Sequence, residues 1–552
     1  MDDTRDRVHE WKRIAQALLN KRRDERWHHL VRHVLPELIP AAALTEMEDD
    51  GLPARLCGRA RTDILKLASA HINYITPRGQ SWFNFKNPAG DSGTQDADDW
   101  YSRATQRVRM ALEKSNFYPE QIAAVIDRCA TGTGMLLVED RDGGLHFSHI
   151  PAGTYAVAEN ENHRIDTAVR KFDWTAHQAA SYWGADALSP AMRSALQNES
   201  ERYSRPFEIW HIVLPNDVPD RGSGYVPLEE RNWLSIYLDP RENHLLALGG
   251  YHEFPYLVSR FLKYGNQVYG TGALAGIQDV MHDAMNLSEA LKVAAQRLAI
   301  PSVLAAPHLI EELDLRAGGI TVMRDDDWQH PPQAFAPAGQ YTIGQQLLEM
   351  YYGEIDDATF VSVLQTVSQV DREMTATEVN ARESERMMTF SQSFTQFASD
   401  FEPFMQRVFG CCFRQGLLPD RPPFEAVEQT LTGGIKLRVP QVSYVGLLAR
   451  ALRRAEYSGL MNTIQIAMQF ASATGDSTPL DFVKMGEAMR YIADEEMAPE
   501  KCLRSPQEIK QRERERQEAQ AEAAATQAAL QQAQANAAQA QADATINGMN
   551  EQ

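Results

Sequence analysis

Cationic residues are scarce in this chain relative to anionic ones. Its 552 residues include 55 Lys and Arg against 75 Asp and Glu, so the formal net charge at pH 7 is −20. Tight general binding to nucleic acid depends on cations that displace phosphate counterions, and this charge balance argues against it. An acidic surface does let a duplex pass without sticking, because it repels the phosphates.

Cysteines and long apolar runs are also few. The five cysteines are scattered and form no C-x-x-C pair, so neither a disulfide framework nor a zinc knuckle is indicated. No stretch approaches the roughly 18 continuous apolar residues of a membrane span. The charged N-terminus lacks the apolar core of a signal peptide. We therefore expect a large protein of several core-forming units, made and used in the cytoplasm, with buried reduced thiols.

The common catalytic and metal-binding signatures are missing as well. The sequence contains no G-x-S-x-G, no H-E-x-x-H and no clustered Cys/His set. His29 and His33 have a spacing that can grip zinc, but no third ligand lies nearby, and a solvated helix face is the alternative. The adjacent acids at 325–327 suit a solvated loop better than a magnesium site. The sequence thus predicts no metal, no cofactor and no catalytic residues.

The segment GNQVYGTGALAGIQD at 265–279 has the strand, glycine loop and helix context of a phosphate-binding loop. Gly265 and Gly270 have the G-x-x-x-x-G spacing of that loop. However, Thr271 stands where a lysine must reach the β- and γ-phosphates, and Gly272 stands where a Ser or Thr holds magnesium. A nucleotide-binding enzyme that uses this loop is one hypothesis. The residues at positions 271 and 272 argue against it.

The second hypothesis for these glycines is a flexible joint that launches a helix. Gly276 comes one residue too late after Gly270 and Gly272 for a G-x-G-x-x-G dinucleotide motif. We therefore expect Gly265, Gly270, Gly272 and Gly276 to form a flexible joint before the helix.

Upstream of the glycines the sequence predicts helices followed by a mixed body. Helical spacing of apolar residues indicates helices within 4–35 and from about Arg59 to Asn73. TGTGMLLVED and LHFSHIP flank the turn at 141–144 and predict a β-hairpin. Further strand candidates and one helix, at Thr175–Trp183, complete a predominantly helical α+β pattern. The strand candidates are 154–158, 167–172, 207–214 and 233–238.

Downstream of the glycines, apolar and small residues alternate at steps of three and four over about 25 residues, or roughly 37 Å of helix. The seam consists of Leu274, Ile277, Met281, Ala284, Ser288, Leu291, Ala295 and Leu298. Such a seam usually belongs to an ordinary core. Its length and its small residues also suit close packing against copies of itself in a ring.

The C-terminal half contains a second long helical pattern and a biased tail. Thr375 and Glu378 form a capping box that predicts a helix start. The helix that follows has an aromatic stripe whose burial is worth roughly 2–3 kcal/mol for each ring. The stripe comprises Phe390, Phe394, Phe397, Phe401 and Phe404, with Pro403 expected to bend the helix. Between Ala519 and Ala544, 21 of 26 residues are Ala or Gln, which favours helix but offers little to bury.

Several blocks of sequence, taken in order, resemble the head-to-tail connector, or portal, proteins of short-tailed double-stranded DNA bacteriophages. No single block is diagnostic, but together they cover about residues 55–500 in the family's order. The blocks are LKLASAHINYITPRGQSWFNF, ATGTGMLLVED, HFSHIPAGTYAVAENENHRIDTAVRKFDWTAHQ, FEIWHIVLPN, YGTGALAGIQDVMHDAMNLSEALKVAAQ and DREMTATEVNARESERMM.

The resemblance implies a portal fold that assembles as a ring of twelve copies at one capsid vertex. A terminase would drive double-stranded DNA in through the ring without sequence specificity, and the DNA would later leave into the tail. The implied partners also include tail or adaptor, scaffold and capsid proteins but no membrane, with assembly in the host cytoplasm. The implied parts are 1–271 wing, 272–299 stem helix 1, 300–340 clip, 341–361 stem helix 2, 362–375 tunnel loop, 376–440 wing return, 441–505 crown and 506–552 tail.

In this interpretation the four glycines let the chain turn from the wing into the stem, where close neighbours leave no room for side chains. Part of the seam packs the stem: Leu274, Ile277, Met281, Leu291 and Leu298. Lys292 on the first stem helix and Arg372 in the tunnel loop are candidates for contact with DNA phosphates, with ordinary ion pairing as the alternative for each. The remaining alternative for the whole chain is another phage structural component, such as a tail ring or an internal scaffold.

Overall fold

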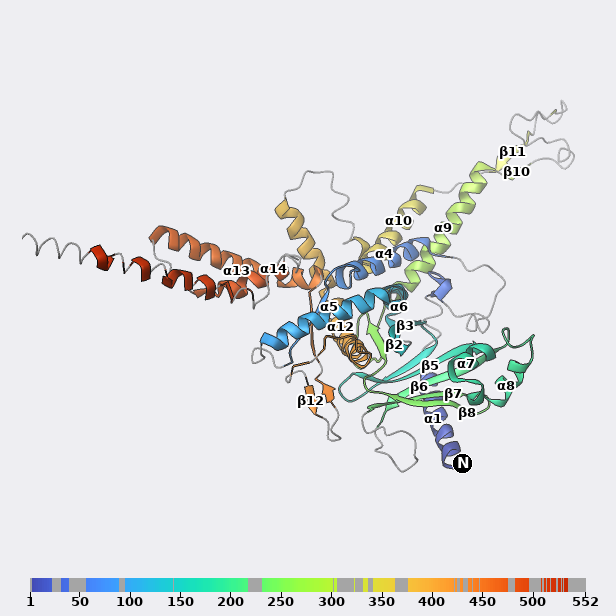
Figure 1. Cartoon of the computed structure of the whole chain (residues 1–552). Coiled ribbons are helices and arrows are strands. Elements are labelled where there is room, and N and C mark those ends of the chain that lie inside the picture. Colours follow the sequence, from blue (N-terminus) through green and yellow to red (C-terminus); the bar gives the residue numbers. More distant parts are fainter. Residues whose placement is uncertain are drawn as a thin grey trace, which may run out of the picture. The chain divides into compact units, whose positions relative to one another are not determined.

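The computed structural model divides the chain into two compact units, Met1–Arg453 and Arg454–Gln552, each considered by itself (Figure 1). The residues that it describes are 2–21, 31–38, 56–88, 95–141, 143–216, 231–300, 302–304, 322, 331–335, 341–362, 376–420, 422–423, 427–429, 435–438, 440–445, 447–474, 482–495 and short pieces between 508 and 534.

Helices dominate the first unit. They are α1 (Asp2–Lys21), α4 (Gly58–Ile75), α5 (Gln95–Lys114), α6 (Phe117–Thr131), α7 (Ala176–Trp183), α8 (Pro190–Gln197), α9 (Gln278–Ala299), α10 (Tyr341–Ala358) and α12 (Ala376–Arg414), with 3-10 turns η1 (Pro36–Leu38), η3 (Ala185–Ala187) and η5 (Ala273–Gly276). The expected helices at 4–35 and Arg59–Asn73 correspond to α1 and α4. The sequence analysis did not anticipate α5 and α6.

The strands form two main sheets and three short pairs. The strands are β1 (Phe83–Lys86), β2 (Thr133–Arg141), β3 (Gly144–Ile150), β4 (Tyr155–Glu159), β5 (Ile165–Thr175), β6 (Pro206–Pro215), β7 (Trp233–Asp239), β8 (His244–Tyr251), β9 (Tyr256–Arg260), β10 (Ser302–Leu304), β11 (Gln333–Phe335), β12 (Val427–Gln429), β13 (Ile435–Leu437) and β14 (Gln441–Tyr444). The short pairs are β1–β14, β10–β11 and β12–β13, all antiparallel.

The first main sheet has the order β3-β2-β9 and is antiparallel throughout. Its β2–β3 pair runs from Met135 opposite Ile150 to Arg141 opposite Gly144, which confirms the predicted hairpin. The central strand β2 is buried along most of its length, as expected for a strand that is covered on both faces. Helices α6 and α12 pack against this sheet.

The second main sheet is a five-stranded meander, β4-β5-β6-β7-β8. Helix α1 covers one face, where Val8, Trp11 and Ala15 are buried against strand residues such as Ile236. Lys12 fixes this helix by donating hydrogen bonds to the Pro240 carbonyl at 2.6 Å and to Asn243 Oδ1 at 2.7 Å. Helices α7 and α8 cover the other face. The predicted strands correspond to β4–β7, and the predicted helix corresponds to α7.

The largest core cluster lies around α12 and is rich in aromatic rings. Phe397, Phe401 and Phe404 are buried, and the Phe401 ring lies 5.8 Å from that of Trp82. The predicted aromatic stripe is therefore confirmed for these three rings, while the side chains of Phe390 and Phe394 lie outside the described set. Pro403 lies inside the helix. The capping-box residue Thr375 is not among the described residues.

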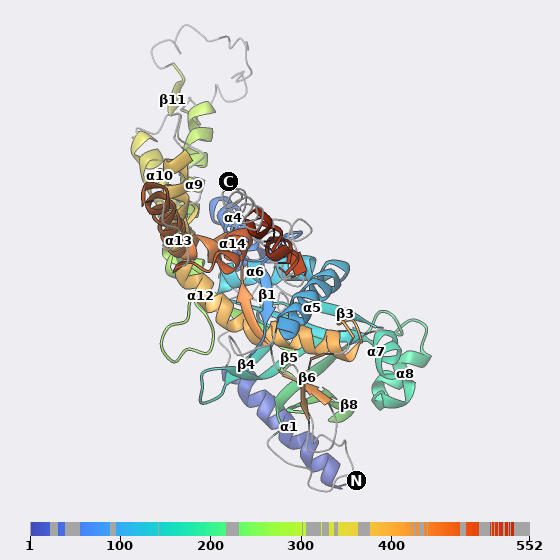
Figure 2. The same ribbon diagram turned by 60° about the vertical axis from the view of Figure 1, so that its left-hand side comes forward.

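Helices α9 and α10 form a helical hairpin that extends away from the two main sheets, with the β10–β11 pair at its far end (Figures 1 and 2). The seam predicted a helix from Leu274. In the structure a 3-10 turn occupies Ala273–Gly276, and α9 begins at Gln278. No helix in the described part of the chain is long and apolar enough to cross a membrane.

The second unit consists mainly of helices. It includes most of α13 (Leu447–Thr474), all of α14 (Met485–Glu495) and short helical pieces between Glu508 and Gln534 that are fully exposed. Large apolar side chains remain exposed on the two named helices, including Phe470 at 59% and Met489 at 61%. The described pieces of the Ala/Gln-rich region are helical, in line with their helical propensity, and the sequence-based choice between a helical and a disordered tail stays a prediction.

Candidate functional site: the glycine joint and the helical hairpin

The glycine segment before α9 packs backbone to backbone against the end of α6. Gly132 ends α6 in the left-handed region, with φ of 99°. A Cβ on Gly132 or on Gly270 would lie within 3.0 Å of the other residue's carbonyl oxygen, and a Cβ on Gly272 would meet the carbonyl of Ala130 equally closely. No side chain fits at these three positions. The sequence analysis did not assign a role to Gly132, because its partner is more than a hundred residues away.

The other two glycines of the segment are not crowded. Gly265 has a left-handed φ of 53°, and Gly276 has an ordinary φ. A Cβ would meet nothing within 4 Å at either position. The expected lack of room therefore applies to Gly270 and Gly272, whereas Gly265 serves the backbone turn. Whether the four glycines join a wing to a stem stays a prediction.

Several amides of this segment, including those of Gly270 and Thr271, donate within the protein. Gly270 N donates to Thr133 Oγ1 at 2.9 Å, and Thr271 N donates to the Leu262 carbonyl at 2.7 Å. Ala275 N donates to the Gly272 carbonyl at 3.2 Å, and Ile277 N donates to the Leu274 carbonyl at 3.3 Å. A phosphate-binding loop needs such amides free to point at the ligand. The geometry therefore gives no support to a nucleotide site here.

Burial along the hairpin changes from its base to its outer end. At the base, Leu274, Ile277 and Met281 are 8% exposed or less. Farther out, Leu291 is half-buried and lies against Gly344 of α10, where a Cβ would approach Leu291 Cδ2 to 2.8 Å. At the outer end Leu298 is 52% exposed. The predicted seam is thus buried only in its first half.

The outer half of the hairpin presents large apolar side chains to solvent. They come from both helices and from the start of the β10–β11 pair, and several are more than half exposed. The set comprises Leu298, Ile300, Leu304, Ile343, Leu347 and Met350. Where exposed apolar side chains form a patch, that patch typically marks an interaction site.

Acidic residues dominate the charge of the hairpin. Helix α9 contains three carboxylates and α10 contains four, against two cations, Lys292 and Arg297. Lys292 is exposed, as a residue that touches a ligand must be. Arg372, the second predicted DNA contact, lies outside the described residues. The hairpin therefore repels rather than attracts a polyanion along most of its surface.

A cluster of charges fixes the base of the hairpin to α4. Arg59 donates from Nε to Asp356 Oδ1 at 2.6 Å and from Nη2 to the other oxygen of that carboxylate. Burial raises the pKa of Asp63, and the neighbouring Asp356 carboxyl raises it further. Burial alone would raise the pKa of Asp356. The hydrogen bonds and positive charge of Arg59 outweigh burial and hold that pKa below its ordinary value. These contacts link the start of α4 to the end of α10.

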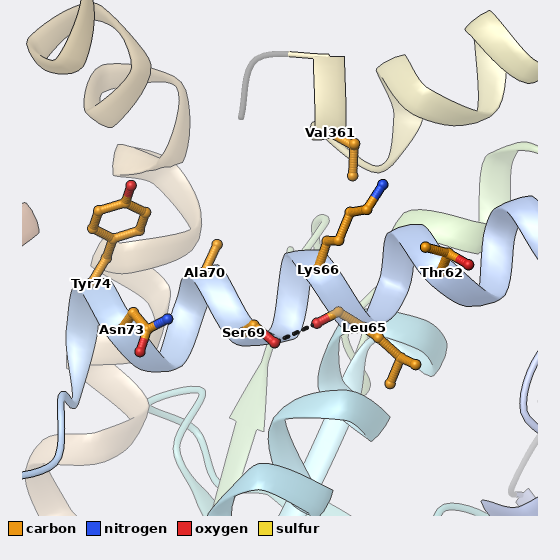
Figure 3. A pocket seen from close by; sticks show the side chains of 8 residues that line it. All are labelled: Thr62, Leu65, Lys66, Ser69, Ala70, Asn73, Tyr74 and Val361. Carbon is orange, nitrogen blue, oxygen red and sulfur yellow. Dashed lines mark hydrogen bonds between the residues drawn. The ribbon is translucent and has the colours of Figure 1, made fainter. Parts of the chain in front are cut away.

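An open groove of about 690 Å³ lies along the exposed face of α4 (Figure 3). Its lining includes Leu65, Lys66, Tyr74 and, across the groove, Val361. Ser69 Oγ donates to the Leu65 carbonyl at 2.8 Å and is not activated by any base in this lining. The lining holds neither a pair of carboxylates nor a histidine, so it offers no acid–base chemistry.

The described residues contain no group of three or more potential metal ligands. The ring of His33, one of the two histidines with zinc-like spacing, packs edge-on against His282 at 4.9 Å, and His29 and the acids at 325–327 lie outside the described part. The four buried cysteines of that part are free thiols, and burial raises the pKa of Cys129 to about 12, so its thiol stays protonated.

Comparison with known proteins gives a consistent result. The family model described as bacteriophage head to tail connecting protein matches residues 9–503. A portal protein of Salmonella phage epsilon15 is 23% identical over 419 residues, covering 73% of this chain and 72% of that protein. A probable portal protein of Bordetella phage BPP-1 is 23% identical over 409 residues, covering 70% and 69%. The family match spans nearly the whole chain, and this protein therefore belongs to the structural family of phage head-to-tail connectors.

Proposed function

We propose that twelve copies of this chain close into a ring at one vertex of the capsid and that double-stranded DNA passes through its centre. The α9/α10 hairpins would line the channel, with the β10–β11 end as the clip and the first unit's sheets and helices as the wing. The second unit would contribute the crown. The ring would have no catalytic activity of its own and would serve packaging, retention and ejection of DNA.

The observation that carries this proposal is the exposed apolar surface on the outer half of the hairpin. A single chain leaves Leu298, Ile343 and Met350 more than half exposed. Burying an Ile or Leu side chain is worth roughly 1.5–3 kcal/mol, so water is a costly environment for several of them at once. Side-by-side copies of the same hairpin would cover these residues, as the heptad-like spacing of α9 allows.

The acidic charge of the hairpin supports a channel that guides DNA. Seven carboxylates against two cations would keep the duplex from adhering to the wall during passage. Lys292, exposed on α9, is the cation that we propose to touch phosphates, together with Arg372. Neither would read base sequence, because contacts with phosphates position DNA without specifying it.

The partners follow from the same proposal. The β10–β11 end of the hairpin would meet a terminase during packaging and tail or adaptor proteins afterwards, and the wing would contact scaffold and capsid proteins. Assembly would take place in the host cytoplasm, and the finished ring would remain in the virion.

Native mass spectrometry tests ring formation directly. One chain has a mass of 62.1 kDa, so we expect a complex of about 745 kDa, which is twelve times that mass. Negative-stain images of the same sample should show annular particles with a central hole. A chain that stays monomeric at micromolar concentration and gives solid globular particles would contradict the proposal.

Nucleotide binding is the competing function, and a titration with labelled ATP distinguishes it. We expect no saturable binding in the micromolar range, because the amides of Gly270 and Thr271 already donate within the protein and no lysine stands at the position that reaches the phosphates. Micromolar binding that is abolished by Gly270→Val would favour an enzyme. The variant Gly276→Ala is the matched control, because its site is open and its φ is ordinary.

A further inference from the structure

Arg128 of α6 is a fully buried cation whose hydrogen-bond acceptors among the described residues are all uncharged, and the Asp400 carboxylate is the anionic group that acts on it electrostatically. Its Nε donates to the Arg260 carbonyl at 3.1 Å, and its Nη2 donates to the Ser393 carbonyl at 2.9 Å and to Ser393 Oγ at 3.0 Å. Its Nη1 donates to His71 Nδ1 at 3.3 Å. Burial lowers the pKa of His71 well below its ordinary value, so His71 is a neutral acceptor.

Two phenylalanine rings enclose the guanidinium group of Arg128. Its Cζ lies 5.4 Å from the centroid of Phe261, just after β9, and 5.4 Å from that of Phe397 on α12. A desolvated guanidinium between two aromatic faces is held by cation–π attraction as well as by its hydrogen bonds. Burial lowers the pKa of Arg128 to about 10, which leaves the group charged at neutral pH.

The same Phe261 ring also contacts the end of α10. Phe360 lies two residues beyond that helix, and its ring is tilted against Phe261 at a centroid distance of 6.3 Å. Phe360 has a left-handed φ of 58°, a conformation that a bulky residue adopts only where its surroundings impose it. The neighbouring Thr359 and Val361 are completely buried. The end of α10 is therefore held in a strained backbone conformation by packing.

The contacts of Arg128 and Phe261 thus bring the end of α10 and the beginning of the buried part of α12 to one place. Ser393 and Phe397 are the buried residues of α12 that precede Asp400 among the described side chains, and both touch Arg128. From Asp400 onward α12 has other anchors, such as the ion pair of Asp400 with Arg260 and that of Arg407 with Glu253. Within 393–399, Arg128 contacts Ser393 and Phe397, and the Ala398 carbonyl accepts a further hydrogen bond from the Tyr444 hydroxyl at 3.3 Å.

We propose that Arg128 is a positioning residue that docks the 393–399 turn of α12 and couples it, through Phe261, to the end of α10. Loss of the Arg128 cation would undock that turn while the rest of α12 stays anchored. Loss of the Phe360 ring would loosen the end of α10 from the same junction. A role in DNA passage would rest on the proposed function, but the coupling itself does not.

Hydrogen exchange read by mass spectrometry on the full-length protein tests this coupling. We expect Arg128→Met to increase amide exchange roughly 10-fold in peptides that cover 393–399, because the Ser393 acceptors lose a buried donor. Peptides that cover 404–411 should exchange as in the wild type. Arg128→Lys, which keeps the cation, should restore part of the protection at 393–399.

The matched control is Arg407→Met, which removes an arginine of similar burial from the other end of the anchored helix. We expect it to increase exchange near 407 and to leave 393–399 unchanged. Phe360→Gly is a milder second variant, because glycine accepts the left-handed backbone. It should increase exchange at 355–361 and, through Phe261, at 393–399.

Unchanged exchange at 393–399 in both Arg128→Met and Phe360→Gly would overturn the proposal. A uniform increase along all of α12 in Arg128→Met would also overturn it, since that result describes general destabilisation. If Arg128→Met does not fold, Phe360→Gly and Arg128→Lys decide. Local exchange that is unchanged in both of them would then refute the coupling. Because the measurement does not require a ring, its failure is separate from a failure of the proposed function.

Discussion

The core around α12 and the outer half of the α9/α10 hairpin contain similar apolar side chains but bury them very differently. Phe401 is 0% exposed and Phe404 is 2% exposed, whereas Ile343 and Leu298 are 57% and 52% exposed. The core around α12 buries its apolar side chains within a single chain. The outer half of the hairpin leaves its apolar side chains exposed, and large exposed apolar patches typically mark interaction sites. This difference in burial distinguishes residues that stabilise the folded chain from residues that we expect to lie between assembled copies.

The largest effect that this contrast predicts is on stability. Phe401→Ala should lower the free energy of unfolding by about 3–5 kcal/mol, because it leaves a cavity in a packed aromatic cluster. Leu298→Ala should change it by less than about 0.5 kcal/mol in the unassembled chain. Urea denaturation of both variants, measured on monomer, gives the comparison. Equal losses in the two variants would mean that the contrast in burial has no energetic meaning.

The reverse pattern is expected for assembly. Ile343→Glu should weaken each contact between copies by about 1.5–3 kcal/mol, because an apolar side chain that would be buried becomes charged. The fraction of ring in native mass spectrometry should fall at fixed concentration, while urea denaturation of the monomer should be unchanged. Gln345→Glu is the matched control, because it adds a charge on the same exposed turn without removing an apolar group. Rings that form equally well with Ile343→Glu would exclude this surface from assembly.

The glycine joint offers a comparison on a smaller scale. Gly272→Ala should lower the free energy of unfolding by about 1–3 kcal/mol, because its Cβ would meet the carbonyl of Ala130 and the backbone has to move. Gly276→Ala has open space and should stay within about 0.5 kcal/mol of the wild type. Thermal or urea unfolding of the pair measures the difference. A neutral Gly272→Ala would show that the two backbone segments can separate at little cost.

The smallest effect is the pH dependence of stability that the buried histidines cause. Burial lowers the pKa of His71 and of His211 well below 6.5 in the folded state. As the pH falls below 6.5 the unfolded chain binds protons that the folded chain does not, so stability falls, by about 1.4 kcal/mol per pH unit for each histidine. His211→Gln should therefore show a shallower loss than the wild type between pH 6.5 and pH 5. Parallel curves for the two proteins would argue against a neutral buried His211.

Local patterns in the sequence predict much of this architecture. Alternation and turn residues predict the β2–β3 hairpin, and the phenylalanine spacing predicts the buried face of α12. The strand β8 was missed because its sequence does not alternate and contains Gly249 and Gly250, which are unfavourable within a strand. Contacts between distant segments could not be predicted, since no local pattern pairs Gly132 with Gly270 or places the Arg128 guanidinium between two rings. An arginine on a helix is ordinarily a surface residue.

The covering of the five-stranded sheet by α1 has a consequence for the order in which the chain matures. Val8 and Trp11 are made well before their partners Ile236 and Leu238, which follow more than two hundred residues later. At about 5–20 residues per second, the ribosome needs roughly 10–45 s to produce them. During that interval only the earlier strands, with Val169, Trp210 and Ile212, are available to α1, and the sheet beneath its apolar stripe is incomplete. The core between α1 and this sheet therefore closes only after β7 has been made.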